Sequence, residues 1–132
     1  LDRLLERFFA LLLKIPTFVT NLPDNFEKYL STDIYKALYQ GIKEGYNIDK
    51  LREVADFADQ ENLVDILTMK GEWEFSSVTE IENQKEIKQL IVLIAEEWLR
   101  QERKKLQIEI EQAEKEGDKE KLGQLLKEFQ NL

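Results

Sequence analysis

The sequence predicts an all-helical fold, and three observations lead to this prediction. Its 132 residues include two prolines and five glycines, so few positions interrupt a helix. Apolar residues recur at spacings of three and four through most of the chain. The alternation of Trp73, Glu74 and Phe75 is too short to indicate a strand. We expect an N-terminal helical bundle, a long projecting helix and a C-terminal helical hairpin.

The composition argues against several classes of function. With 19 basic and 27 acidic residues the net charge is −8, which disfavours binding to a nucleic-acid backbone. The absence of cysteine excludes disulfides and thiolate metal sites, and the absence of histidine removes the commonest general base. We therefore expect no enzymatic activity, no metal and no cofactor. No apolar run is long enough to span a membrane, and no signal peptide is visible. The default expectation is a cytoplasmic protein.

The first part of the chain reads as a series of short helices. A wide apolar stripe predicts a deeply buried helix from Leu1 to Ile15, capped by Asp2 and ended by Pro16. One more helical turn is expected over residues 17–22 and a short amphipathic piece over residues 26–30. The chain starts at Leu1 rather than at a methionine, so we expect it to be part of a longer protein.

Capping residues and glycines divide the following segment. We expect Ser31 to start a helix that stops at Gly45, and Asn47 to start another whose apolar pattern includes Ala58. A further helix covers residues 63–70 and is expected to end at Gly71. The aromatic residues Trp73 and Phe75 would then seal one end of the bundle.

One long helix is predicted from Glu80 to Glu116, with Thr79, Ser76 or Ser77 as its cap. An apolar stripe runs to Leu99, is interrupted by the polar residues 100–105, and resumes at Leu106. At about 1.5 Å per residue, such a helix is roughly 55 Å long, which exceeds the diameter of so small a domain. We therefore expect a bundle subdomain at residues 1–99 and a projecting hairpin at residues 100–132, with the long helix shared between them.

The hairpin consists of the end of the long helix, a turn at residues 116–118, and a last helix capped by Asp118. Gly123 falls inside this last helix, at a cost of about 1 kcal/mol relative to alanine. It either allows a close approach of Gln112 or Ala113, leaves the helix marginally stable, or is simply tolerated.

Apolar residues of the hairpin exceed what its two helices can bury between them. Ile108 lies off the line of Leu106, Ile110 and Ala113, and the adjacent Leu125 and Leu126 cannot both face one neighbour. Apolar surface left exposed in this way marks a partner site. The alternatives are a hairpin that packs only within the chain and one that self-associates.

Charged residues near the hairpin have a simpler interpretation. The basic cluster Arg100, Arg103, Lys104 and Lys105 has only Trp98 as an aromatic neighbour, so it is a weak candidate for a phosphate site. Paired carboxylates such as Glu96 and Glu97 are typical of a solvated helix face. We interpret both groups as solvent-exposed helix surface.

Two stretches of the chain resemble parts of a known protein family. The first is the tail Gln112-Ala-Glu-Lys-Glu-Gly-Asp-Lys-Glu-Lys-Leu-Gly-Gln-Leu-Leu-Lys-Glu-Phe-Gln130, and the second is Glu6-Arg-Phe-Phe-Ala-Leu-Leu-Leu-Lys-Ile-Pro16. The tail resembles the end of bacterial DNA primase, and the second stretch resembles the start of the C-terminal domain of that primase. The resemblance covers nearly the whole chain in layout but only these two stretches in residue pattern.

The resemblance implies a non-catalytic domain that binds the N-terminal domains of the hexameric replicative DNA helicase. The hairpin would make the principal contact and the bundle would modulate the helicase, without direct contact with nucleic acid or membrane. The resemblance extends this role to five apolar residues of the hairpin: Ile108, Leu122, Leu125, Leu126 and Phe129. The alternatives are the N-terminal domain of a replicative helicase, whose fold is similar, and a helical homodimerisation module.

Overall fold

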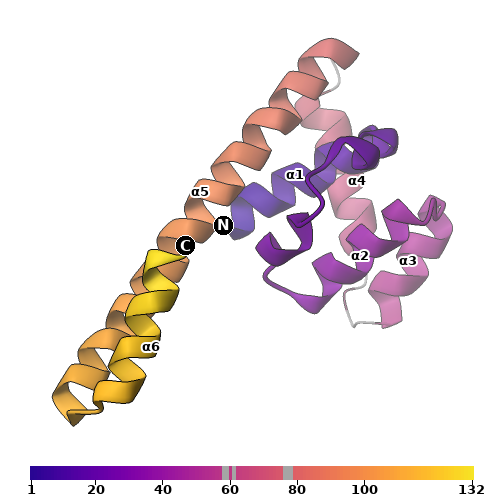
Figure 1. Ribbon diagram of the computed structural model, residues 1–132. Helices are drawn as coiled ribbons and strands as arrows, with labels where there is room; N and C mark the ends of the chain where they lie inside the picture. The colour runs from indigo at the N-terminus through magenta and orange to yellow at the C-terminus, as the bar shows by residue number, and fades with distance from the viewer. Residues whose placement is uncertain (58–59, 61, 76–78) are drawn as a thin grey trace. The chain divides into compact units, whose positions relative to one another are not determined.

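The computed structural model describes residues 1–57, 60, 62–75 and 79–132, and all regular elements in these ranges are helical (Figure 1). This confirms the all-helical class for the described residues. The predicted roles of Ala58, Ser76 and Ser77 fall outside them. The helices are α1 (Asp2–Lys14), α2 (Asp33–Lys43), α3 (Ile48–Phe57), α4 (Leu63–Phe75), α5 (Glu80–Glu116) and α6 (Lys119–Gln130), with 3-10 helices at Pro16–Asn21 and Phe26–Tyr29.

The chain divides into two compact units, residues 1–94 and residues 95–132. The larger unit contains α1 to α4 and the first part of α5. The smaller unit contains the rest of α5 and α6. Helix α5 is continuous from Glu80 to Glu116, so the polar residues 100–105 do not interrupt it.

Helix α1 lies at the centre of the larger unit. Its residues Leu5, Phe8, Phe9, Ala10, Leu11 and Leu12 are all fully buried. The rings of Phe8 and Phe26 lie 4.8 Å apart, and Phe9 stacks on Tyr35 at the same distance. The wide apolar stripe in the sequence thus corresponds to a helix that other elements surround on most sides.

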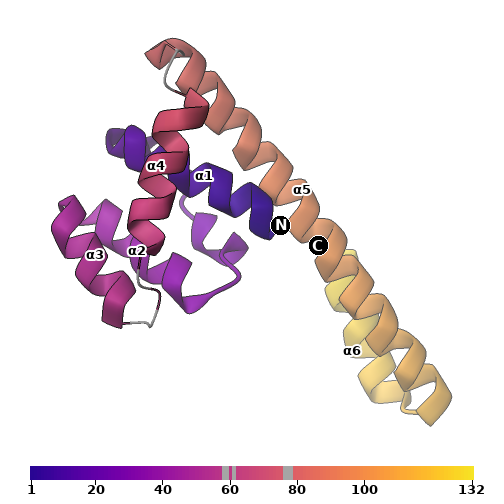
Figure 2. The same cartoon turned by 180° about the vertical axis from the view of Figure 1, so that it is seen from behind.

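Helices α1 and α4 cross in close contact, as both ribbon views show (Figures 1 and 2). Gly71 is buried at this crossing, and a Cβ atom added to it would lie 2.6 Å from the carbonyl oxygen of Ala10. The prediction that Gly71 ends its helix is therefore wrong, because α4 continues to Phe75. The glycine is a contact point between two backbones instead of a stop. The Nζ of Lys14 donates a hydrogen bond to the carbonyl oxygen of Phe75 at 2.9 Å.

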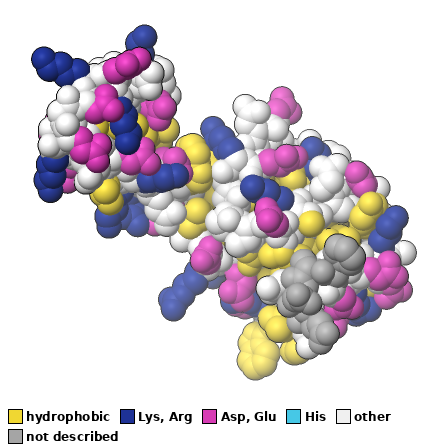
Figure 3. All heavy atoms as spheres, turned by 90° about the horizontal axis from the view of Figure 1, so that it is seen from below, with side chains coloured by type: hydrophobic (Ala, Val, Ile, Leu, Met, Phe, Trp, Pro, Cys, Tyr) yellow, Lys and Arg dark blue, Asp and Glu magenta, His cyan; other side chains and the backbone are white. Residues whose placement is uncertain are grey.

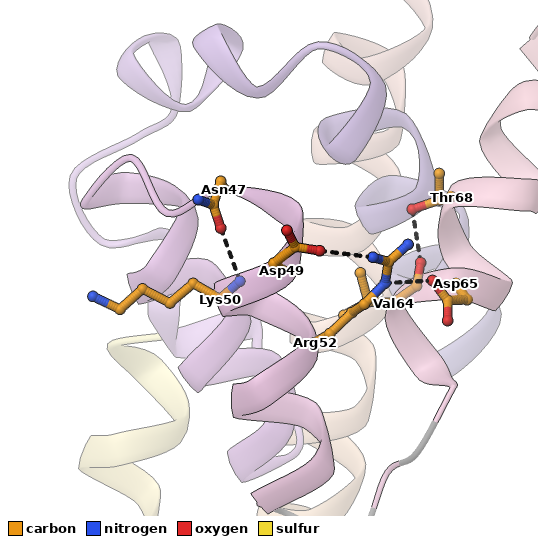
Figure 4. Close-up of polar contacts among 7 residues, drawn as sticks. All are labelled: Asn47, Asp49, Lys50, Arg52, Val64, Asp65 and Thr68. Carbon is orange, nitrogen blue, oxygen red and sulfur yellow. Dashed lines mark hydrogen bonds and ion pairs between the residues drawn. The ribbon is translucent and has the colours of Figure 1, made fainter.

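Arg52 joins α3 to α4 (Figure 4). Its guanidinium lies 2.9 Å from Asp49 on the same helix and 2.7 Å from Asp65 on α4. These hydrogen bonds raise the pKa of Arg52 above its ordinary value, with Asp65 the larger cause. Asn47 caps α3, as predicted, because its side-chain oxygen accepts from the Lys50 amide at 2.9 Å.

Other helix starts differ in part from the prediction. Thr79 caps α5 by accepting from the amide of Glu82 at 3.2 Å, which selects it from the predicted candidates. Helix α2 is capped by Thr32, whose hydroxyl accepts from the Tyr35 amide, and the predicted cap Ser31 is wrong. The Ser31 hydroxyl donates to the carboxylate of Asp2 at 3.2 Å. Asp2 lies in the first turn of α1 and not at its cap, so that prediction is also wrong.

The first part of α5 completes the core of the larger unit. Its residues Ile87, Leu90 and Ile94 are buried in the same cluster as the side chains of α1. An ion pair of 3.0 Å between Arg7 and Glu86 also connects the two helices. Over the described ranges, none of the helices combines the length and apolar character that a membrane crossing requires.

Candidate protein-binding surface

Chemistry that would indicate an enzyme is sparse. The sequence has no histidine and no cysteine. Within the described ranges, acidic side chains do not form a group of three that could hold a metal ion. Exposed apolar surface is therefore the stronger candidate for a functional site.

In the smaller unit, α6 runs back along the second half of α5 (Figures 1 and 2). The turn between the two helices uses Gly117, whose φ of 70° is a conformation that glycine adopts at little cost. Asp118 caps α6, as predicted, by accepting from the Lys121 amide at 3.1 Å. Its negative charge also suits the N-terminal end of a helix.

The contact between α5 and α6 is small. Three residues are buried in it: Leu106, Ala113 and Leu125. Ile110, Leu122 and Leu132 pack against these three and remain partly accessible. Each helix thus buries a narrow stripe, and other apolar side chains of the unit are left outside it.

The predicted partner-binding residues fall into three groups. Leu125 is buried and Leu122 is partly buried, so these two contribute mainly to the contact between α5 and α6. Leu126 is 44% exposed and Phe129 is 37% exposed, so both present apolar surface to solvent. The neighbouring leucines 125 and 126 point different ways, as the sequence predicts.

Ile108 is 59% exposed, but it does not share a surface with Leu126 and Phe129. It lies two residues from the buried Leu106, which is roughly 200° around an α-helix with about 3.6 residues per turn. Ile108 therefore lies on the side of α5 that faces away from α6. The structure brings together Leu122, Leu126 and Phe129, and it separates Ile108 from them. We call these three residues the α6 face.

Gly123 lies beside the α6 face in the middle of the helix. It is exposed, and a Cβ atom added to it would meet no atom within 4 Å. Of the three alternatives for Gly123, the close approach of Gln112 or Ala113 is therefore ruled out. Nothing in the contact between α5 and α6 requires a glycine at this position.

In the basic cluster of Arg100, Arg103, Lys104 and Lys105, the side chain of Arg100 is paired with a carboxylate. The Nε of Arg100 donates to Glu97 at 3.0 Å, and a second, shorter hydrogen bond joins the same two side chains. This hydrogen bonding lowers the pKa of Glu97 and raises that of Arg100. Because the two groups partly neutralise each other, the cluster presents less charge than the sequence alone indicates.

A second apolar surface lies on α4 and was missed by the sequence-based interpretation. Ile66, Met69 and Trp73 are 52%, 64% and 84% exposed. Phe75 is buried, as a residue that seals the bundle would be, but Trp73 is not, so this prediction is wrong for Trp73. The three exposed residues recur at i, i+3 and i+7, a spacing that could have revealed a helix continuing through Gly71.

No family model, curated protein or solved structure matches this chain.

Proposed function

We propose that this chain is a non-catalytic interaction domain of bacterial DNA primase that binds the N-terminal domains of the hexameric replicative helicase. The exposed α6 face is the observation that carries the proposal. In this proposal the larger unit is the helical bundle, and the α5–α6 pair is the hairpin that makes the principal contact. The chain would recruit primase to the replication fork, and the bundle would modulate the helicase.

The energetics of the smaller unit support a docking role. A helix pair with three buried residues gains little stability from its own core. Leu126 and Phe129 remain exposed on the same side of α6, next to the partly buried Leu122. A partner that covered this face would bury apolar surface and would also stabilise the helix pair.

The residue pattern supports the choice of partner. The tail from Gln112 to Gln130 resembles the end of bacterial primase, and it includes the turn, the cap Asp118 and the whole of α6. The α6 face lies within this stretch. The proposal therefore assigns the helicase contact to Leu126 and Phe129, with Leu122 at its border.

The test is the double variant Leu126→Ala/Phe129→Ala, assayed by co-purification with a cognate replicative helicase. If each of the two side chains contributes about 2 kcal/mol, as hot-spot residues of an interface do, affinity should fall by a factor of roughly 1,000. Both side chains are exposed, so circular dichroism should show an unchanged helix content. Binding at the wild-type level would contradict the proposal.

Ile108→Ala is the matched control. It removes an exposed apolar side chain of the same unit from the opposite side of α5. We expect this variant to bind the helicase like the wild type. A loss confined to Ile108→Ala would instead place the contact on the outer side of α5.

The α6 face also suits a second function, a homodimer formed by pairing of two hairpins. Such a dimer would bury Leu126 and Phe129 against the same residues of the other copy. Sedimentation of the isolated chain tests this second function, because a chain that stays monomeric at micromolar concentration would exclude a homodimer.

A further inference from the structure

The exposed residues Ile66, Met69 and Trp73 form one apolar stripe along α4, which we call the α4 patch. Together with Lys70 and Glu74 they line a surface hollow of the larger unit. Figure 3 shows hydrophobic side chains at the surface of this unit, among charged ones. A stripe at i, i+3 and i+7 on one helix is the pattern with which proteins bind a second helix.

The packing of α4 fixes the direction in which this stripe points. On the opposite side of the helix, Val64, Leu67, Gly71 and Phe75 are all buried in the larger unit. Gly71 lies directly against the carbonyl of Ala10, where even a methyl group would clash. Rotation of α4 to bury the patch would break this contact and expose the core side. The patch is therefore a fixed surface feature.

Carboxylates border the α4 patch in excess of cations. Lys70 lies 3.2 Å from Glu6 and 3.8 Å from Glu74, so one cation serves two carboxylates. Arg52 likewise forms ion pairs with two carboxylates, those of Asp65 and Asp49. Glu72, next to Trp73, forms no ion pair within the described ranges. The border of the patch is therefore net negative.

This charge determines which helix fits. Two α4 patches facing each other would bring their carboxylates together, and like charges disfavour such a symmetric contact. A suitable occupant has an apolar stripe flanked by lysine or arginine.

The chain itself carries a helix of this kind. The α6 face lies between Lys119, seven residues before Leu126 and on the same side of the helix, and Lys127. Both lysines are exposed, and neither forms an ion pair within the described part of the chain. Glu128 lies roughly 200° around α6 from Leu126, away from this face.

We propose that the α4 patch of one copy binds the α6 face of a second copy. The two surfaces differ, so the contact is head-to-tail. The inference does not depend on the proposed function, because both surfaces belong to this chain. It extends that function, since a helicase that covered the α6 face would compete with self-association.

Sedimentation equilibrium over a range of concentrations tests the proposal with two variants. Met69→Ala/Trp73→Ala removes most of the α4 patch, and Leu126→Asp/Phe129→Asp disables the α6 face. For the wild type we expect an average mass that rises with concentration above that of a monomer, and for each variant alone the mass of a monomer. An equimolar mixture of the two should form a dimer and nothing larger, because it contains one intact pair of surfaces.

Val92→Ala is the matched control, because Val92 is 56% exposed on α5 and belongs to neither surface. It should associate like the wild type. Circular dichroism should show that all variants keep their helix content, since every substituted side chain is exposed.

Three results would overturn the proposal. The first is a wild type that stays monomeric at every concentration. The second is association that survives Met69→Ala/Trp73→Ala, which would indicate pairing of hairpins. The third is a mixture of the two variants that remains monomeric. Helicase co-purification separates this outcome from that of the proposed function, because the α4 variant keeps the α6 face and should still bind the helicase.

Discussion

Gly71 and Gly123 both lie inside helices, yet they have opposite surroundings. Gly71 is buried where α1 and α4 touch, and Gly123 is exposed with open space around it. The first glycine is needed because the Ala10 carbonyl occupies the place of its side chain. No neighbour requires the second glycine, so its effect is only the lower helix stability that glycine gives relative to alanine.

Gly71→Ala should lower the stability of the larger unit by about 1–3 kcal/mol, because the added methyl group forces α1 and α4 apart. Urea unfolding followed by circular dichroism measures the change. Gly123→Ala is the matched control, and it should stabilise α6 by up to about 1 kcal/mol. A neutral Gly71→Ala would show that the crossing can relax.

Sequence reasoning could not distinguish these two glycines. A helical glycine in a close contact and one at an exposed site carry the same local signal, and only the partner backbone separates them. The same limit explains the misplaced cap at Ser31, since Thr32, another common capping residue, follows one position later. Local patterns identify the residue type at a helix end more reliably than its position.

At the scale of the helix, α6 depends strongly on its first turn. It has 12 residues, and one of its side chains, Leu125, is buried. So short a helix is marginal in isolation. Asp118 supplies both a hydrogen bond to the Lys121 amide and a favourable charge at the N-terminal end.

Asp118→Ala should therefore destabilise α6 by about 1 kcal/mol. Amide hydrogen exchange measured by NMR should show faster exchange across residues 119–130 and no change in α1. Asp118→Asn is the control, because asparagine keeps the capping oxygen and loses only the charge. If the alanine and asparagine variants exchange alike, the effect is electrostatic and the capping bond contributes little.

The sequence-based prediction placed both ends of α5 correctly, but it ended α4 too early. Thr79 is a strong cap, and the break at Gly117 coincides with a turn that needs a positive φ, so both ends of α5 carry local signals. In α4 the glycine suggested an end, although the exposed stripe continues to Trp73. The tertiary contact with α1 outweighs the local preference there.

At the scale of the whole molecule, the two units differ in the size of their cores. The larger unit buries side chains from α1 to α5, whereas the smaller unit buries three residues. The all-helical class and the apolar face of the last helix followed from spacing alone. The exposure of the α4 patch did not, because it depends on which side of α4 meets the other helices.

This difference predicts unequal protection from hydrogen exchange. Amides of α6 should open locally, with a free energy below that of global unfolding, whereas amides in the centre of α1 should exchange only on global unfolding. Exchange measured at several urea concentrations tests this, because local openings depend little on urea. Equal free energies and urea dependences in both helices would instead indicate that the two units unfold as one.

The two tryptophans are divided between the units. Trp73 is 84% exposed in the larger unit, and Trp98 is partly buried in the smaller one. Because indole fluorescence responds to the solvent around the ring, Trp73→Phe and Trp98→Phe would each leave one emission signal that reports on a single unit. Quenching of these signals by iodide would then follow each unit separately, without any attached label.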